Sequence, residues 1–183
     1  MPVVEALVAG GVRAFEVTLD SPDAMAAIRT LATQYSDGSL LVGAGTVLDV
    51  ASATAAVEAG ASFLVSPHTD RELIRWAVAQ RIPIFPGAFT PSEILAAWRA
   101  GASAVKLFPA STVGPSYLRE LRGPLAEIPL IPTGGVTGEN AAAFIAAGAL
   151  GVGVGGWLFA SGSPDLIRQR AAQLISAVQS ATH

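Results

Sequence analysis

The sequence predicts an α/β fold of the TIM (β/α)₈ barrel type, formed by one domain over residues 1–183. Short apolar runs alternate with Ala-rich segments, which is typical of parallel strands joined by helices. An Ala-Gly turn closes a predicted helix at Gly10, Gly60, Gly101 and Gly148. The spacings of 50, 41 and 47 residues fit two strand–helix units per repeat, which favours a barrel over an open sheet.

Seven apolar runs bounded by turn residues are predicted to be buried strands. In chain order they cover residues 13–19, 40–46, 63–67, 82–88, 104–109, 130–135 and 150–156. Residues 2–9, which precede them all, are predicted to form a helix. An eight-stranded barrel begins with a strand, so the expected barrel lacks its first strand in this chain.

Capping signals mark the starts of four of the intervening helices. Each has Ser or Thr before the helix, with Pro at the first helical position or Glu three residues on. The predicted N-caps are Ser21, Thr69, Thr90 and Ser163.

Composition excludes several classes of protein. The net charge is −3 without a basic stripe, so nucleic acid is not an expected partner. Although 51% of the residues are hydrophobic, no segment approaches the roughly 18 apolar residues of a membrane span. The chain has no Cys, which excludes disulfides and thiolate metal sites, and its first residues lack the pattern of a signal peptide. We therefore expect a cytoplasmic protein.

Lys106, the only lysine in the chain, lies in the middle of the predicted strand 104–109. Burying an ammonium group costs several kcal/mol unless the group is paired or deprotonated. A desolvated lysine has a lowered pKa, and its free amine attacks carbonyl groups to form a Schiff base. The alternative is a structural lysine whose ammonium reaches solvent at the strand end or pairs with a neighbour.

Glu16 is a second ionisable residue inside an apolar strand. Side chains alternate between the two faces of a strand, so Phe15 and Val17 face the helices and Glu16 faces the barrel interior. The same alternation turns Lys106 and Phe108 inward. Glu16 and Lys106 are thus candidates for a general acid/base and a nucleophile, and the alternative is a buried structural ion pair.

Glycine clusters follow three of the predicted strands. One ends in Thr46, and the other two contain Thr133-Gly134-Gly135 and Gly155-Gly156. Glycine-rich turns after the last two strands of such a barrel, leading into short helices, form a phosphate cradle from backbone N–H groups. They could also be tight turns that bind nothing. His68 has no neighbouring ligand set, so no metal site is expected.

Taken in order, the motifs of the chain closely resemble the 2-keto-3-deoxy-6-phosphogluconate / 4-hydroxy-2-oxoglutarate aldolases. The matching motifs are Glu16-Val17-Thr18-Leu19, Gly43-Ala44-Gly45-Thr46-Val47-Leu48, Val65-Ser66-Pro67, Pro86-Gly87 with Thr90 and Glu93, Val105-Lys106-Leu107-Phe108-Pro109 and Pro132-Thr133-Gly134-Gly135-Val136. The resemblance covers essentially the whole chain.

This resemblance implies a class I aldolase without metal or cofactor, assembled as a homotrimer. Lys106 would form the Schiff base, and Glu16 would be the general acid/base. The expected reaction cleaves a 2-keto-3-deoxy-6-phospho sugar acid to pyruvate and glyceraldehyde 3-phosphate, or 4-hydroxy-2-oxoglutarate to pyruvate and glyoxylate.

The resemblance also implies the substrate-binding residues. Thr46 matches the contact to the pyruvate carboxylate, and Phe108 matches a packing residue beside the lysine. The remaining expected substrate-binding positions are Pro67, Thr133, Gly134, Gly135, Gly155 and Gly156.

Two positions depart from the phosphogluconate-specific members. Asp20 stands where they carry an Arg for the substrate carboxylate, and Gly156 stands where they carry a Ser for the phosphate. These changes shift the expectation toward phosphogalactonate-type or hydroxyoxoglutarate-type substrates. A phosphorylated sugar acid is still favoured, because the cluster around Thr133 is present.

Two other functions are consistent with the same barrel. A phosphosugar isomerase or epimerase needs an acid/base pair but no amine, which would leave Lys106 unexplained. An inactive barrel that serves as a binding protein is the second alternative.

Overall fold

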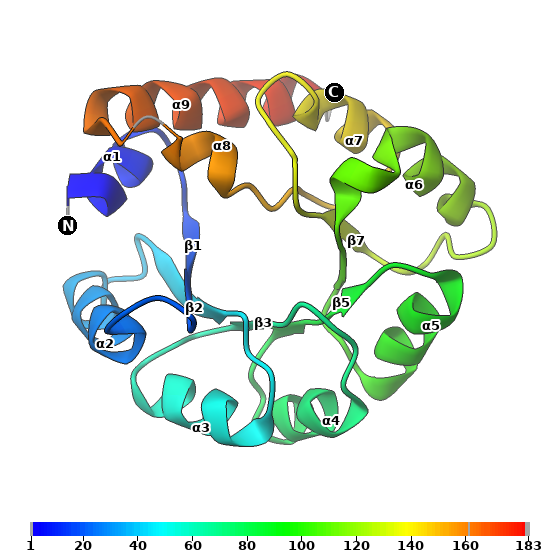
Figure 1. The fold of residues 1–183 in the computed structure, drawn as a ribbon, viewed down its shortest axis with the longest axis horizontal. Coiled ribbons are helices and arrows are strands. Elements are labelled where there is room, and N and C mark those ends of the chain that lie inside the picture. The colour runs from blue at the N-terminus through cyan, green and yellow to red at the C-terminus, as the bar shows by residue number, and fades with distance from the viewer. Residues whose placement is uncertain (1, 161, 182–183) are drawn as a thin grey trace. The chain divides into compact units, whose positions relative to one another are not determined.

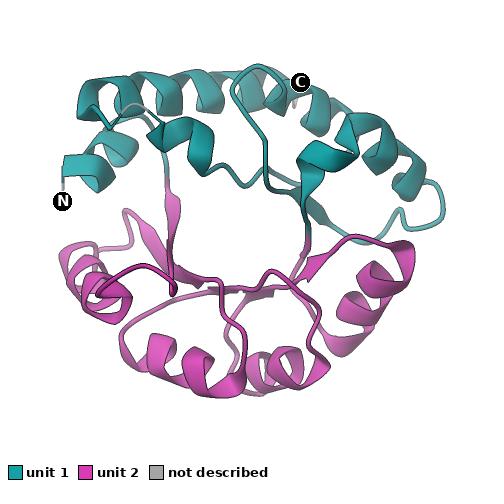
Figure 2. Cartoon of the chain, viewed as in Figure 1, with its two compact units in different colours: residues 1–12, 107–183 teal, residues 13–106 magenta. Residues whose placement is uncertain are grey.

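A computed structural model describes residues 2–160 and 162–181 of the chain. Residues 1–12 and 107–183 form one compact unit, and residues 13–106 form a second (Figure 2). We call them unit 1 and unit 2 and describe each by itself. The single domain over residues 1–183 stays a prediction.

Unit 2 is a succession of parallel strands and helices (Figure 1). Its elements are β1 (Ala14–Thr18), α2 (Ala24–Gln34), β2 (Leu41–Gly45), α3 (Val50–Glu58), β3 (Leu64–Val65), α4 (Arg71–Ala79), β4 (Ile84–Phe85), β5 (Gly87–Ala88), α5 (Pro91–Ala100) and β6 (Val105–Leu107). The first four strands form one sheet in the order β1-β2-β3-β4, and β5 neighbours β6 in another. In the first sheet Glu16 pairs with Gly43 and Thr18 with Gly45.

The helices of unit 2 cover one face of its sheet, and the apolar core lies between them. Ile28 of α2, Ile74 of α4 and Ile94 of α5 are each fully buried. The other face of the sheet carries Glu16 and, across β2, the ring of Phe63, whose edge packs on Phe85 with the ring centroids 5.9 Å apart. This second face therefore carries the predicted acid.

Unit 1 contains the remaining described helices and one strand. Its elements are α1 (Pro2–Ala9), the 3₁₀ turn η1 (Ala110–Thr112), α6 (Gly114–Arg122), β7 (Leu130–Pro132), α7 (Ala141–Ala146), α8 (Gly156–Phe159) and α9 (Pro164–Ala181). Helix α9 packs on α1 and α7. The predicted helix over residues 2–9 is confirmed. Within the described ranges, no helix has the length and hydropathy that a bilayer crossing needs.

Two of the strand predictions were wrong in detail. Residues 150–156 do not form a strand: Gly153 makes an isolated parallel bridge with Thr133, and Gly156 already begins α8. This run contains four glycines, which weaken a strand because they have no side chains to pack. Residues 82–88 form two short strands separated by Pro86, which has no N–H to donate to a ladder.

Two of the predicted caps were also wrong. Asp70, not Thr69, caps α4 and accepts hydrogen bonds from two backbone N–H groups, whereas the Thr69 hydroxyl donates to the Gly87 carbonyl. Ser21 is not a cap, because α2 begins at Ala24. The box in which Thr90 and Glu93 exchange hydrogen bonds at the start of α5 is confirmed.

Candidate active site

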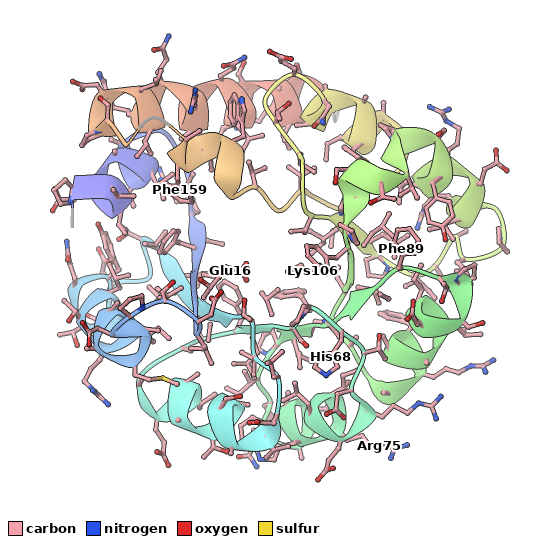
Figure 3. The ribbon with its side chains drawn as sticks, in the orientation of Figure 1. Glu16, His68, Arg75, Phe89, Lys106 and Phe159 are labelled. Carbon is pink, nitrogen blue, oxygen red and sulfur yellow. The ribbon has the colours of Figure 1, made fainter. Side chains whose placement is uncertain are left out.

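Glu16 on β1 and Lys106 on β6 form the ionisable centre of unit 2. Lys106 is only 8% exposed and, with Ser66, is one of two buried polar residues in the described part of the chain. Its backbone N–H donates to the carbonyl of Pro86, which fixes β6 beside the preceding strand. Figure 3 shows both side chains on the sheet face opposite the helices, as the alternation of side chains predicts.

Burial shifts both groups toward their neutral forms. Loss of solvation raises the pKa of the Glu16 carboxyl above 4.5, and the nearby charge of Lys106 opposes this shift. Loss of solvation also lowers the pKa of the Lys106 amine below 10.5, and the charge of Glu16 opposes it. The lysine is therefore more readily available as a free-base nucleophile, and the glutamate holds a proton more readily than an exposed carboxylate.

Gly45 makes room for the Glu16 carboxyl. A Cβ atom at position 45 would lie 2.9 Å from Cδ and 3.0 Å from Oε2 of Glu16, which is closer than real contacts allow. Oε2 is buried and has no hydrogen-bond partner among the described residues. A buried oxygen without a partner is costly, and such atoms are typical of sites where a ligand or water supplies the missing bond.

Thr46 has a backbone conformation that a β-branched residue rarely adopts. Its φ is 55°, in the left-handed region, immediately after β2 ends at Gly45. This conformation costs on the order of 1–3 kcal/mol and persists only where the surroundings impose it. Such strain is concentrated at functional sites, which agrees with the expected role of Thr46 in binding a carboxylate.

The segment after β3 is held by a buried hydroxyl. Ser66 is fully buried, and its Oγ lies 3.0 Å from both the carbonyl oxygen and Nδ1 of His68. The Pro67 carbonyl lies against the Cα of Gly87, where no side chain would fit. Pro67 is thus fixed at the end of β3, while the His68 side chain is exposed.

Unit 1 holds the other predicted substrate-binding residues. The ring of Phe108 lies against Gly134, whose φ of +88° also favours glycine. Thr133 follows β7 and donates its backbone N–H to the Leu107 carbonyl, and its side chain packs against Gly153. Phe108, Thr133 and Gly134 therefore form one packed group within this unit.

The remaining glycines that are expected to bind phosphate lie at two places in unit 1. Gly135 directly follows Gly134, and Gly155 and Gly156 stand at the start of α8. Gly135 packs against Ser111, whose N–H donates to the Gly134 carbonyl. Gly155 is the N-cap of the four-residue helix α8 and Gly156 is its first residue, with open space where either Cβ would stand. The predicted short helix after this cluster is present, and its binding of phosphate stays a prediction.

The structure brings Glu16 and Lys106 together, which the sequence predicted, and adds three features that the sequence analysis missed. They are the space that Gly45 leaves for the Glu16 carboxyl, the strained backbone at Thr46 and the buried hydroxyl of Ser66. Gly45 could have been found from its place inside a strand, where glycine often marks a close approach. Backbone strain at a threonine leaves no signal in the sequence.

Chemically, the pair in unit 2 can attack a carbonyl carbon and transfer protons beside it. No group of three or more His, Asp or Glu side chains with metal-binding geometry occurs in the described part of the chain.

Comparison with known proteins places these residues in a family. Residues 1–178 match the family described as KDPG and KHG aldolase. The 2-dehydro-3-deoxy-phosphogluconate aldolase of Pseudomonas aeruginosa is 43% identical over 147 residues, which are 80% of this chain and 66% of that enzyme, just under two thirds of its length. The 2-dehydro-3-deoxy-6-phosphogalactonate aldolase of Escherichia coli is 37% identical over 180 residues, which are 97% of this chain and 87% of that enzyme.

A solved structure gives the same assignment. The KDPG aldolase of Legionella pneumophila, with pyruvate captured at low pH as a covalent carbinolamine intermediate, matches with a TM-score of 0.87 and 32% identity over 94% of this chain and 86% of that one. KDPG aldolases have a TIM-barrel-like α/β fold, so the predicted fold class is confirmed. As its motifs predicted, the chain belongs to the KDPG and KHG aldolase family, a family of lyases.

Proposed function

We propose that this protein is a class I aldolase that cleaves a 2-keto-3-deoxy-6-phospho sugar acid to pyruvate and glyceraldehyde 3-phosphate through a Schiff base on Lys106. One observation carries the proposal: the only lysine of the chain is buried beside the half-buried Glu16, and burial favours the neutral amine. The carbinolamine captured in the Legionella pneumophila relative supports the same chemistry.

The first half of the reaction forms the electron sink. The Lys106 amine attacks the C2 keto carbon of the substrate and gives a carbinolamine. Glu16 supplies the proton with which the hydroxyl leaves as water, and the product is a protonated imine. The raised pKa of Glu16 suits this step, because its carboxyl keeps a proton to higher pH than an exposed carboxyl and can donate that proton to the leaving hydroxyl.

The second half breaks the carbon–carbon bond. Glu16, now a carboxylate, takes the proton of the C4 hydroxyl through water. The C3–C4 bond breaks, its electron pair moves to the iminium nitrogen, and the aldehyde leaves. The remaining enamine is protonated at C3, and hydrolysis of the imine releases pyruvate and the free amine of Lys106.

The substrate-binding residues of this proposal are those that the family resemblance implies. The Thr46 hydroxyl would hold the pyruvate carboxylate, and Pro67 and Phe108 would pack on the carbon chain. Backbone N–H groups around Thr133–Gly135 and Gly155–Gly156 would hold the phosphate. Homotrimeric assembly and a cytoplasmic location belong to the same proposal.

Steady-state cleavage assays test the function and the substrate class together. We expect kcat/KM for 2-keto-3-deoxy-6-phosphogalactonate or 2-keto-3-deoxy-6-phosphogluconate to exceed that for 4-hydroxy-2-oxoglutarate by at least about tenfold, because the phosphate adds charge-assisted hydrogen bonds. Faster cleavage of 4-hydroxy-2-oxoglutarate would contradict the phosphorylated substrate. If a folded protein cleaves none of the three, the aldolase proposal fails.

Position 20 gives a sharper test of substrate preference. Asp20 is exposed directly after β1, where a positive charge is expected in phosphogluconate-specific relatives. We expect Asp20→Arg to raise kcat/KM for the phosphogluconate substrate relative to the phosphogalactonate substrate. The charge-matched control is Glu58→Arg at the exposed end of α3, which should leave that ratio unchanged.

A further inference from the structure

A hollow of about 360 Å³ lies between α4 and α5, within unit 2. Three arginines line it: Arg71 and Arg75 from α4, and Arg99 from α5. Leu95, Ala96, Ala100 and the hydroxyl-bearing Ser92 complete the lining. The lining contains no carboxylate, so the hollow concentrates three positive charges on a chain whose net charge is −3.

The side chains of these arginines have no protein partner among the described residues, a property that they share with Arg29, Arg81 and Arg119. The guanidinium groups of Arg71, Arg75 and Arg99 form no hydrogen bond or ion pair with any residue in the described part of the chain. By contrast, Arg122 donates to a backbone carbonyl, and Arg170 donates to the Trp157 carbonyl and stacks over its ring. The guanidinium groups at the hollow are therefore available to a ligand.

The placement of two of these arginines opposes the electrostatics of their own helix. Arg71 is the first residue of α4, where the positive end of the helix dipole disfavours a cation. Arg75 follows at i+4 on the same face, where like charges destabilise a helix. Residues that break local rules are expected where function requires them.

Asp70 and Glu93, at the starts of α4 and α5, form no ion pair with the arginines of the hollow, and neither does Glu72. Asp70 accepts the N–H groups of Glu72 and Leu73 at the start of α4. Glu93 accepts from Phe89 and Thr90 at the start of α5, and these bonds lower the pKa of its carboxyl. Both side chains are therefore used to cap helices.

We propose that this arginine hollow is a binding site for a small organic phosphate with at least two negative charges. Guanidinium groups bind phosphate oxygens in pairs of hydrogen bonds, and three of them match a doubly charged group. Leu95, Ala96 and Ala100 would contact the carbon skeleton. Figure 3 shows Arg75 on the outer side of α4, pointing away from Lys106, so this site is separate from the candidate active site.

Titration calorimetry with inorganic pyrophosphate on the full chain tests the proposal. We expect saturable binding to the wild type, weakened at least about tenfold by Arg75→Gln and by Arg99→Gln, because each loses charge-assisted hydrogen bonds. The matched control is Arg29→Gln, an exposed arginine on α2, which should change the affinity less than about twofold. Unchanged labelling of Lys106 by pyruvate and borohydride in these variants shows that the active site is intact.

Three outcomes would overturn the proposal. In the first, the wild type does not bind pyrophosphate at millimolar concentration, and in the second the variants bind it as tightly as the wild type. In the third outcome, Arg75→Gln changes the oligomeric state in sedimentation without weakening pyrophosphate binding, which would make the hollow an interface between copies of this chain. The cleavage assay is independent, so failure here leaves the aldolase proposal standing.

Discussion

Gly45→Ala tests whether the placement of the Glu16 carboxyl matters for catalysis. The new Cβ would lie 2.9 Å from Cδ of Glu16, whereas ordinary contacts begin at 3.4 Å, so the carboxyl must move by about 0.5 Å or more. A displacement of about 1 Å of a catalytic group can cost 10²-fold in rate, so we expect kcat to fall about 10- to 100-fold. The added methyl group should also destabilise the fold by about 1–3 kcal/mol.

Two assays separate Schiff-base formation by Lys106 from proton transfer by Glu16. Trapping of pyruvate on Lys106 should persist in Gly45→Ala, while enzyme-catalysed exchange of the pyruvate methyl protons with solvent deuterium should slow with kcat. Gly151→Ala is the matched control, because its Cβ would have no neighbour within 4 Å, and it should behave as wild type.

A second substitution tests the same reasoning by rescue. Adding Glu16→Asp to Gly45→Ala shortens the acid by one methylene and should recover part of the lost activity, although Glu16→Asp alone loses activity. The reasoning is refuted if Gly45→Ala keeps wild-type kcat and stability while Glu16→Gln is inactive.

Three further predictions concern the charged pair and the strained residue. Lys106→Ala should abolish cleavage and leave the circular dichroism spectrum unchanged. Because Glu16 then loses its positive neighbour, the pKa of its carboxyl rises further, and the free energy of unfolding of the variant should fall as the pH rises above about 4.5. Equal urea midpoints at pH 5 and pH 8 would contradict this. Glu16→Gln removes the charge that raises the pKa of Lys106, so the onset of pyruvate trapping should move to lower pH, and a move to higher pH would count against the pairing. Thr46→Gly should relieve the strain at φ 55° and hold or raise the melting temperature while it increases KM, whereas an unchanged KM would exclude a role for the hydroxyl.

Periodicity predicted most of the fold because burial follows it closely. The alternation in β1 placed Glu16 opposite the helix-covered face, and the lone lysine indicated Lys106 without any structure. The motif around Thr90 predicted its helix start correctly, because both halves of that box lie within four residues. Such local signals need no tertiary information.

The predictions were wrong where contacts between distant residues, or a neighbouring residue that can also cap a helix, determine the local structure. Residues 150–156 look like a strand by hydropathy, but their glycines give only an isolated bridge at Gly153. Asp70 caps α4 in place of Thr69, and the Thr69 hydroxyl instead donates to the carbonyl of Gly87, 18 residues away. The contact between Gly45 and Glu16 depends on the register of two strands, which single-residue patterns do not encode.

The central claim is that Lys106 forms a Schiff base with a keto acid, and intact mass after incubation with pyruvate and borohydride tests it most directly. Because the chain has one lysine, we expect a single reduced adduct that maps to Lys106 and is absent from Lys106→Ala. A folded protein that forms no adduct, or an adduct that persists in Lys106→Ala, would contradict it.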